Sequence, residues 1–322
     1  MNSVGIEATN TDKRPVRENN KWSRLGKKLI SQRYLQAMAL LGVIWMIVFN
    51  YIPMYWITIA FRDYNIVPHS VNPWVGLKHF KEFLNDDNLG YVIRNTLGMS
   101  ALKLVIGFPL PIAFAILLNE VRSTFFKKSI QTISYLPHFL SWVILGGILA
   151  NWLADVGIVN KILMALGWIH EPFSYLAEPS YFWTIVVSSD IWKELGWSAI
   201  IYLAAISSIS SELYEAATID GAGRFQKIFN ITLPSIRGTI SILLILAVSG
   251  ILNSNFDQIL VLRNQLNEPK STVIDIYVYQ VGIVLSRFSY STAVNLIKSV
   301  IAFLLLLGAN SVTKKLNDTS LF

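Results

Sequence analysis

A run of polar side chains interrupts an apolar stretch near residue 255. It reads NSNFDQ and occupies residues 253–258. Amides, hydroxyls and carboxylates can hydrogen-bond the hydroxyls of a sugar, and the ring of Phe256 suits its C–H surface. On a helix, at about 100° per residue, the polar members span roughly 200° and Phe256 points away from them. Such an arc is too costly against lipid, so it is either a hydrogen-bonded seam between helices or the wall of a translocation cavity.

A second polar interruption has the sequence IWKELGW. Lys193 and Glu194 are adjacent and point about 100° apart on a helix, so we do not expect them to pair face to face. Gly196 allows close approach, and Trp192 and Trp197 offer ring faces for a ligand. The alternative is an interfacial aromatic belt with a lysine that reaches toward the headgroups.

These side chains lie within long apolar stretches. The chain has 322 residues, of which 53% are apolar and 15% charged, whereas soluble domains average about 25% charged. This composition predicts an all-α polytopic membrane protein. The stretches long enough to span a bilayer lie at about 36–61, 95–118, 130–154, 181–206, 237–262 and 291–311. Pro137, Gly146 and Gly147 interrupt the third of them.

The distribution of basic residues predicts the topology. With a cytoplasmic N-terminus, the inside segments hold 16 Lys and Arg residues and the outside segments hold 8, so the net charge of +7 indicates orientation rather than nucleic-acid binding. We expect a basic segment at 1–33, a six-span domain at 34–315 and a tail at 316–322, with both termini and the 207–237 loop in the cytoplasm. Residues 21–33 are either a basic helix on the inner leaflet or a topology anchor.

The 207–237 loop is polar and its residues predict a helix, a turn and a second helix. Ser211 can cap the first helix, and Gly221 can end it with a positive φ. The second helix is expected from about Arg224 toward Ile231. Pro234 then suits the first turn of the next long helix. Without further information, the alternative is an amphipathic helix lying on the bilayer.

The spacing within this loop resembles a family signature. Glu215-Ala216-Ala217 is followed by three residues, Gly221, nine residues and Ile231-x-Leu233-Pro234. This resembles the membrane subunits of binding-protein-dependent ABC importers, which implies the type I permease fold and makes 207–237 the coupling loop that receives a cytoplasmic ATPase. The resemblance assigns coupling to Glu215, Ala216, Ala217, Asp220, Gly221, Ala222, Ile231, Leu233 and Pro234.

A second resemblance concerns the substrate. The run SYLPHFLSWVILGGI at 134–148 is similar to the branch of maltose-type permeases that import complex oligosaccharides. In related sugar permeases the matching stretches line the sugar path, which implies this role for Gly196, Trp197, Ser254, Asn255 and Gln258. Lys103 and Lys193 could meet carboxylates, so uronic-acid oligomers such as alginate are a possible substrate.

The sequence lacks the motifs of several enzyme classes, which limits the activities to be expected. The chain has no P-loop, no nucleophile elbow and no histidine pair at metal-ligand spacing, so we expect no cofactor or metal in it and no enzymatic activity. The resemblance implies that separate ATPase subunits bind ATP and Mg, and that the partners are a second homologous permease, two ATPases, an extracellular solute-binding protein, the sugar and membrane lipid, in a bacterial cell membrane. The rival reading, a stand-alone secondary transporter or channel, would need an ion site and inverted repeats.

Overall fold

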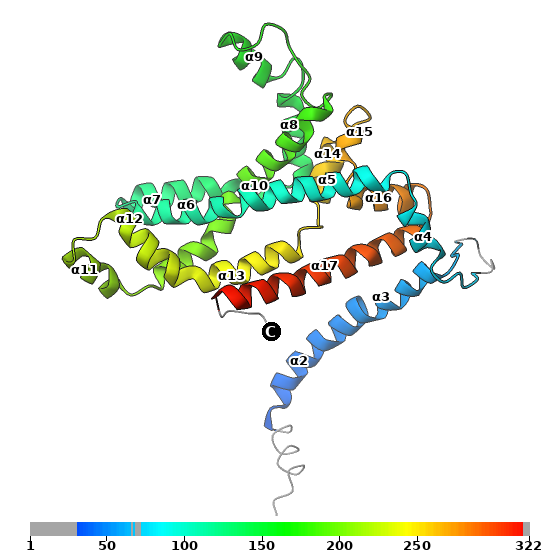
Figure 1. The fold of residues 1–322 in the computed structure, drawn as a ribbon, viewed down its shortest axis with the longest axis horizontal. Coiled ribbons are helices and arrows are strands. Elements are labelled where there is room, and N and C mark those ends of the chain that lie inside the picture. Colours follow the sequence, from blue (N-terminus) through cyan, green and yellow to red (C-terminus); the bar gives the residue numbers. More distant parts are fainter. Residues whose placement is uncertain (1–30, 66, 68–71, 318–322) are drawn as a thin grey trace, which may run out of the picture. The chain divides into compact units, whose positions relative to one another are not determined.

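The computed structural model describes residues 31–65, 67 and 72–317, and they are almost entirely helical (Figure 1). The described part contains no strand; its one β contact is an isolated antiparallel bridge between Arg62 and Trp74. The predicted all-α fold is confirmed. Most of the proposed basic helix at 21–33 and of the tail at 316–322 lies outside the described residues. The described part of the chain divides into two compact units, with the boundary between residues 57 and 58.

The described part of the first unit is one helical run. It comprises α2 (Arg33–Met46), the π-helical turn η1 (Ile47–Tyr51), α3 (Ile52–Met54) and the start of η2 (Tyr55–Phe61). Pro53 lies in the first turn of α3, directly after the π-helical turn. A wider turn accommodates a residue that has no N–H to donate, so the helix passes this proline without ending.

The second unit contains the remaining helices. They are α4 (Lys78–Leu84), α5 (Leu89–Leu102), η3 (Lys103–Gly107), α6 (Pro109–Glu120), α7 (Thr124–Tyr135), η4 (Leu136–Phe139), α8 (Trp142–Trp152), α9 (Ile158–Ala165), α10 (Pro179–Ser207), α11 (Ser211–Ile219), α12 (Arg224–Lys227), η5 (Ile228–Thr232), α13 (Leu233–Ser249), α14 (Phe256–Leu262), α15 (Glu268–Ser271), α16 (Ile274–Tyr279), η6 (Gln280–Val284) and α17 (Phe288–Asn317).

Among the described residues, four helical runs are long and apolar enough to cross a membrane. They are Arg33–Phe61, Leu89–Glu120, Arg224–Ser249 and Phe288–Lys315. The predicted fourth span corresponds to α10, which has 29 residues. It is long enough, but every 18-residue window of it contains the three charged residues Asp190, Lys193 and Glu194, so its composition is less apolar than that of the other spans.

Two predicted spans are not continuous helices. The stretch 130–154 bends by 98° between Thr124–Phe139 and Trp142–Trp152, where Ser141 caps the second helix by accepting from the Ile144 N–H at 3.3 Å. The stretch 237–262 is broken between α13 and α14. The predicted polar arc of about 200° over 253–258 was therefore wrong, because residues 253–255 are not helical; the Ser254 N–H and the Asn255 side chain bond to α16 and α10 instead.

Three apolar cores hold the helices of this unit together; two of them share α10, and the third joins α4 and α5 to α16 and α17. The α6–α10–α13 core contains Ala115, Leu118, Ala199, Tyr202, Leu203, Ile206 and Ile236. The α5–α10–α14 core contains Met99, Phe182, Val186, Ile259, Leu262, Val273 and Ile276. Between them, α10 carries the charged residues at 190–194 and Trp197. Two separately packed cores with a polar layer between them leave room for a cavity at that level.

Candidate functional site

A cavity of about 520 Å³ lies in this polar layer. Its wall comes from α5, η3 and α6, from the middle of α10, and from the end of α13 with the segment that follows it. Much of the wall is apolar, which is usual for small-molecule sites. The lining side chains that can bond or stack on a ligand are Ser100, Lys103, Phe108, Asp190, Glu194, Trp197, Ser198, Tyr202 and Asn253.

An ion pair crosses one side of the cavity. Lys103 Nζ lies 3.2 Å from Asp190 Oδ2 and also donates to Gln258 Oε1 at 3.3 Å. Asp190 Oδ1 accepts from Asn255 Nδ2 at 3.0 Å. Lys103 thus already has two partners, and its charge is compensated by Asp190.

Gln258 is a fully buried link between α14 and α10. Its Nε2 donates to Val186 O at 2.8 Å and to Ser189 Oγ at 2.9 Å, and its side chain is inaccessible. Of the five predicted solute contacts, Trp197 lines the cavity, whereas Gly196, Ser254, Asn255 and Gln258 contact neighbouring helices. Their contact with solute stays a prediction.

A mutation of Gln258 distinguishes a residue that joins two helices from one that contacts the solute. Replacing it with alanine leaves buried partners unsatisfied, so we expect Gln258→Ala to lower the free energy of unfolding by about 1–3 kcal/mol. Uptake per assembled complex should stay near normal if Gln258 is a seam residue. The measurements are thermal unfolding in detergent and transport normalised to complex, with the exposed Asn151→Ala as the control. Normal stability with several-fold weaker uptake would assign Gln258 to the solute.

Trp197 is held in place by a charged cluster. Its ring stacks on His138 with centroids 4.3 Å apart and planes 2° apart. His138 Nδ1 lies 2.7 Å from Glu194 Oε2, and the buried Lys193 Nζ donates to His138 O at 2.7 Å and to Glu194 Oε1 at 3.1 Å. The expectation that Lys193 and Glu194 do not pair was wrong. The two residues leave the helix in directions about 100° apart, but their side chains are long and flexible. They meet because both bond to His138.

Gly196 marks the closest approach of α10 and α7. A Cβ at this position would lie 2.3 Å from Ser134 O and 2.5 Å from its carbonyl carbon. The absence of a side chain therefore lets the two backbones touch, which sets the position of the neighbouring Trp197.

Sequence reasoning missed several polar residues at this level. Asp190 was not identified, and neither was Asp275, which pairs with Lys298 Nζ across α16 and α17. A signal existed, because each of these acids and lysines interrupts or borders an apolar stretch. Ionisable groups at membrane depth normally have a partner, so an isolated lysine there predicts a carboxylate on another helix.

The coupling loop contains the predicted helix, turn and helix, with two corrections. Ser210, not Ser211, is the N-cap of α11, because its hydroxyl accepts from the Glu212 N–H at 3.3 Å. Gly221 ends that segment with φ +78°, and the Ala222 N–H reaches back to Ala217 O at 2.8 Å.

The second correction concerns the helix before Pro234. Pro234 lies in the first turn of α13, as predicted, but α13 is not separate from the short helix before it, because α12, η5 and α13 form one helical run from Arg224 to Ser249. The π-helical turn at Ile228–Thr232 precedes the proline and accommodates its missing N–H. Hydrogen bonds of 2.9 Å from Tyr214 to Thr232 and 2.7 Å from Lys227 to Thr218 hold α11 against this run.

The surface of the coupling loop is exposed and mixed in character. Glu215, Ala216 and Asp220 are exposed, and the apolar Ile219 and Phe225 are 86% and 77% exposed. Apolar side chains among charges and small residues are typical of a protein docking surface.

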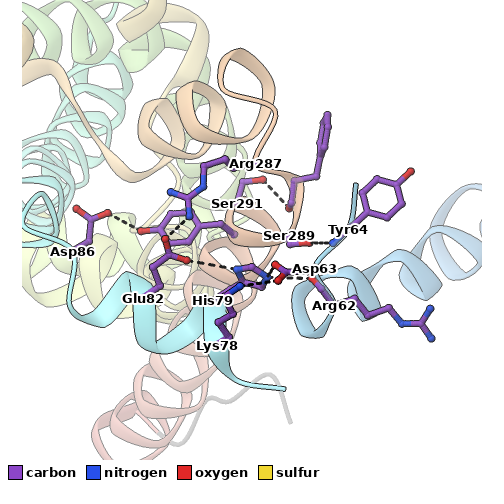
Figure 2. Close-up of polar contacts among 12 residues, drawn as sticks. Arg62, Asp63, Tyr64, Lys78, His79, Glu82, Asp86, Arg287, Ser289 and Ser291 are labelled. Atoms are coloured by element: carbon purple, nitrogen blue, oxygen red, sulfur yellow. Dashed lines mark hydrogen bonds and ion pairs between the residues drawn. The ribbon is translucent and has the colours of Figure 1, made fainter. Parts of the chain in front are cut away.

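A second polar cluster joins the segment around α4 to the start of α17 (Figure 2). Arg287 is ion-paired with Glu82, Ser289 Oγ accepts from the Tyr64 N–H at 2.9 Å, and Tyr290 donates to Asp86 at 2.7 Å. A pocket of about 330 Å³ lies among these side chains. Within the described residues, no group of His, Asp and Glu side chains is placed to hold a metal ion.

The charges of this cluster stabilise one another. Burial acts to raise the pKa of the Asp86 carboxyl, but hydrogen bonds from Tyr277, Asn88 and Tyr290 outweigh it and hold that pKa below its usual range. The Glu82 carboxylate raises the pKa of the Arg287 guanidinium. Because the Asp86 pKa is lowered on folding, its contribution is complete above about pH 4 and is lost only as the pH falls through the lowered value.

Comparison with known proteins places the chain in a family. Residues 107–317 match the family described as "Binding-protein-dependent transport system inner membrane component". Protein LplB of Bacillus subtilis is 41% identical over 90% of this chain and 91% of its own length. The polygalacturonan/rhamnogalacturonan transport system permease YteP of the same organism is 41% identical over 95% of both chains.

Solved structures agree with these relatives. A bacterial ABC transporter involved in the import of the acidic polysaccharide alginate contains a chain with a TM-score of 0.84 and 38% identity, covering 91% of this chain and 99% of that one. The same kind of transporter in complex with an alginate pentasaccharide-bound periplasmic protein gives a TM-score of 0.85. The chain therefore belongs to the family of inner-membrane components of binding-protein-dependent transport systems, and it is the permease subunit of an ABC sugar importer rather than an enzyme.

Proposed function

We propose that this permease passes an oligosaccharide through the cavity beside Lys103 and Trp197. The observation that supports this best is the position of the cavity in the polar layer between two apolar cores, with an immobilised indole ring on its wall. Aromatic faces and hydroxyl-binding groups are what a sugar requires. The sugar, delivered from outside the cell, would enter this cavity and leave toward the cytoplasm by alternating access.

ATP drives the cycle from outside this chain. Separate ATPase subunits bind ATP and Mg and dock on the coupling loop, whose nine signature residues from Glu215 to Pro234 form the socket. The exposed apolar residues Ile219 and Phe225 support a protein partner at this surface. The bias of basic residues supports a cytoplasmic position for this loop and both termini, with residues 34–315 as the membrane domain.

The cavity wall of this chain recognises hydroxyls and ring faces rather than carboxylates. Lys193 is buried against His138 and Glu194, and Lys103 is paired with Asp190. The two lysines expected to meet uronic-acid carboxylates are therefore already compensated. An acidic substrate, such as the alginate imported by the similar transporter, would have its carboxylates read by the partner permease and the solute-binding protein.

Uptake by the assembled complex tests the proposal. The complete importer with its binding protein is reconstituted in proteoliposomes and given labelled alginate trisaccharide, trigalacturonate or maltotriose. ATP-dependent accumulation of one of these supports oligosaccharide import. ATP-dependent uptake of none of them, in a complex whose ATPase responds to its own binding protein, would point away from these sugars.

The indole of Trp197 provides a sharper test. Replacing it with alanine removes the ring face from the cavity and the stacking partner of His138, so we expect Trp197→Ala to reduce uptake about tenfold, as for loss of one good aromatic contact. Trp192→Ala is the matched control, since Trp192 lies on the same helix, is 53% exposed and is absent from the cavity wall. Equal uptake by the two variants would remove Trp197 from the path.

A further inference from the structure

The break in the fifth membrane stretch lies at residues 250–255 (Figure 1). The helix before it is continuous from Arg224 in the coupling loop and packs on α10 and α17. The helix after it, α14, packs on α8 and α16 and is linked to α10 through Gln258. The break therefore separates a helix that begins at the coupling loop from one that is part of the α5–α10–α14 core.

A carboxylate of α16, that of Asp275, binds the backbone of the break. Asp275 Oδ2 accepts from the Ser254 N–H at 2.9 Å, and its other oxygen is ion-paired with Lys298 of α17. The side chains of this pair are 18% and 12% exposed. An irregular backbone at membrane depth needs such partners for its free polar groups.

A carboxylate of α10, that of Asp190, binds the next residue, Asn255. Asp190 Oδ1 accepts from Asn255 Nδ2 at 3.0 Å, and Oδ2 pairs with Lys103. Two consecutive residues are thus held by two helices, each through a carboxylate that has its own lysine. We call Asp190, Lys103, Asp275 and Lys298 the clasp.

The clasp is a poor arrangement for stability alone. Ser254 Oγ is buried and makes no hydrogen bond, which lowers stability. Partly buried ion pairs add little over well-packed apolar residues, whereas removing one partner leaves an unpaired charge. These features suit a segment that has a second arrangement, in which the hydroxyl and the carboxylates exchange partners.

The break is also part of the cavity wall. Gly250, Ile251 and Asn253 line the cavity, next to Lys103 and Asp190 of the clasp. Any displacement of this segment therefore changes the cavity directly.

We propose that residues 250–255 are a joint that converts movement of the coupling loop into a change of the cavity wall, with the clasp residues as positioning residues that set its two arrangements. The proposal rests on the proposed function, since the coupling loop must receive movement from an ATPase. It names the two-state element that coupling between distant sites requires.

A single cysteine provides the test. The chain contains no cysteine and Asn253 is exposed on the cavity wall, so labelling of this chain in Asn253→Cys comes from the joint alone. In the reconstituted complex, we expect maleimide labelling rates to differ about fivefold or more between the ATP-free and ATP–vanadate states, the lower end of ordinary coupling. Added Asp275→Asn or Lys298→Met should reduce this difference to below about twofold while ATP hydrolysis continues.

Two further variants keep the test decisive. Lys298→Arg retains the charge and should preserve most of the difference, and Lys314→Met is the matched control, an exposed lysine on the same helix. Clasp variants whose labelling follows the nucleotide as in the parent would overturn the joint. If they do not assemble, equal labelling of Asn253→Cys in both states of the parent would overturn it. A parent complex without ATPase activity would instead refute the proposed function, and the joint with it.

Discussion

Replacing Gly221 with proline should abolish ATP-driven transport while the membrane helices still fold. Gly221 has φ +78°, whereas proline is held near −65°, so the turn between α11 and α12 cannot form. α11 would then be displaced from the contacts that hold it against the helix from Arg224. We expect uptake and binding-protein-stimulated ATP hydrolysis to fall at least about tenfold, corresponding to the roughly 1.4 kcal/mol or more that such backbone strain costs.

Two control substitutions distinguish the loss of this turn from non-specific damage to the coupling loop. Gly223→Ala should be almost neutral, because Gly223 has φ −71° and its added Cβ would meet Gln226 Oε1 only at 3.7 Å. Gly221→Asn should be intermediate, since asparagine tolerates the left-handed region better than other residues. Wild-type hydrolysis and uptake in Gly221→Pro would contradict the assignment of this loop as the ATPase socket.

Replacing Gly196 with leucine should destabilise the chain rather than merely obstruct a path. The first carbon of any side chain here would lie 2.3 Å from the Ser134 carbonyl oxygen, and backbone cannot yield as a flexible side chain can. We expect the free energy of unfolding to fall by about 3 kcal/mol, the upper part of the usual range for overpacking. Thermal unfolding in detergent and the yield of assembled complex measure this directly.

Gly147→Leu is the matched control for this substitution. No heavy atom lies within 4 Å of a Cβ at Gly147, so the same added volume should be tolerated. A Gly196→Leu variant that assembles with normal stability but does not transport would show that this glycine opens the solute path, as the resemblance to sugar permeases implies.

The coupling loop could be predicted well because its structure is local. The spacing from Glu215 to Pro234 identified the turn at Gly221, and the positive φ there follows from a residue type that adopts it freely. The errors were local too. One neighbouring serine replaced another as the cap, and a π-helical turn carried the helix through Pro234, which a propensity argument does not anticipate.

The candidate site could be predicted only in part because it depends on distant contacts. Periodicity assumes an unbroken helix, so it predicted that the polar residues of 253–258 form one continuous arc of roughly 200°. The actual partners come from far along the chain, with Asp275 21 positions from Ser254 and Asp190 65 positions from Asn255. Which carboxylate meets which lysine follows from helix packing, and a single sequence does not specify that packing.

The pairing of lysines with carboxylates has an electrical consequence. Lys103, Lys193 and Lys298 are paired with Asp190, Glu194 and Asp275 respectively, so each pair carries no net charge. Moving one unpaired charge across a membrane potential of about 100 mV changes its energy by about 2.3 kcal/mol. Paired charges that move together experience almost none of this force. Movement of these three pairs should therefore add almost nothing to any dependence of the transport rate on the membrane potential.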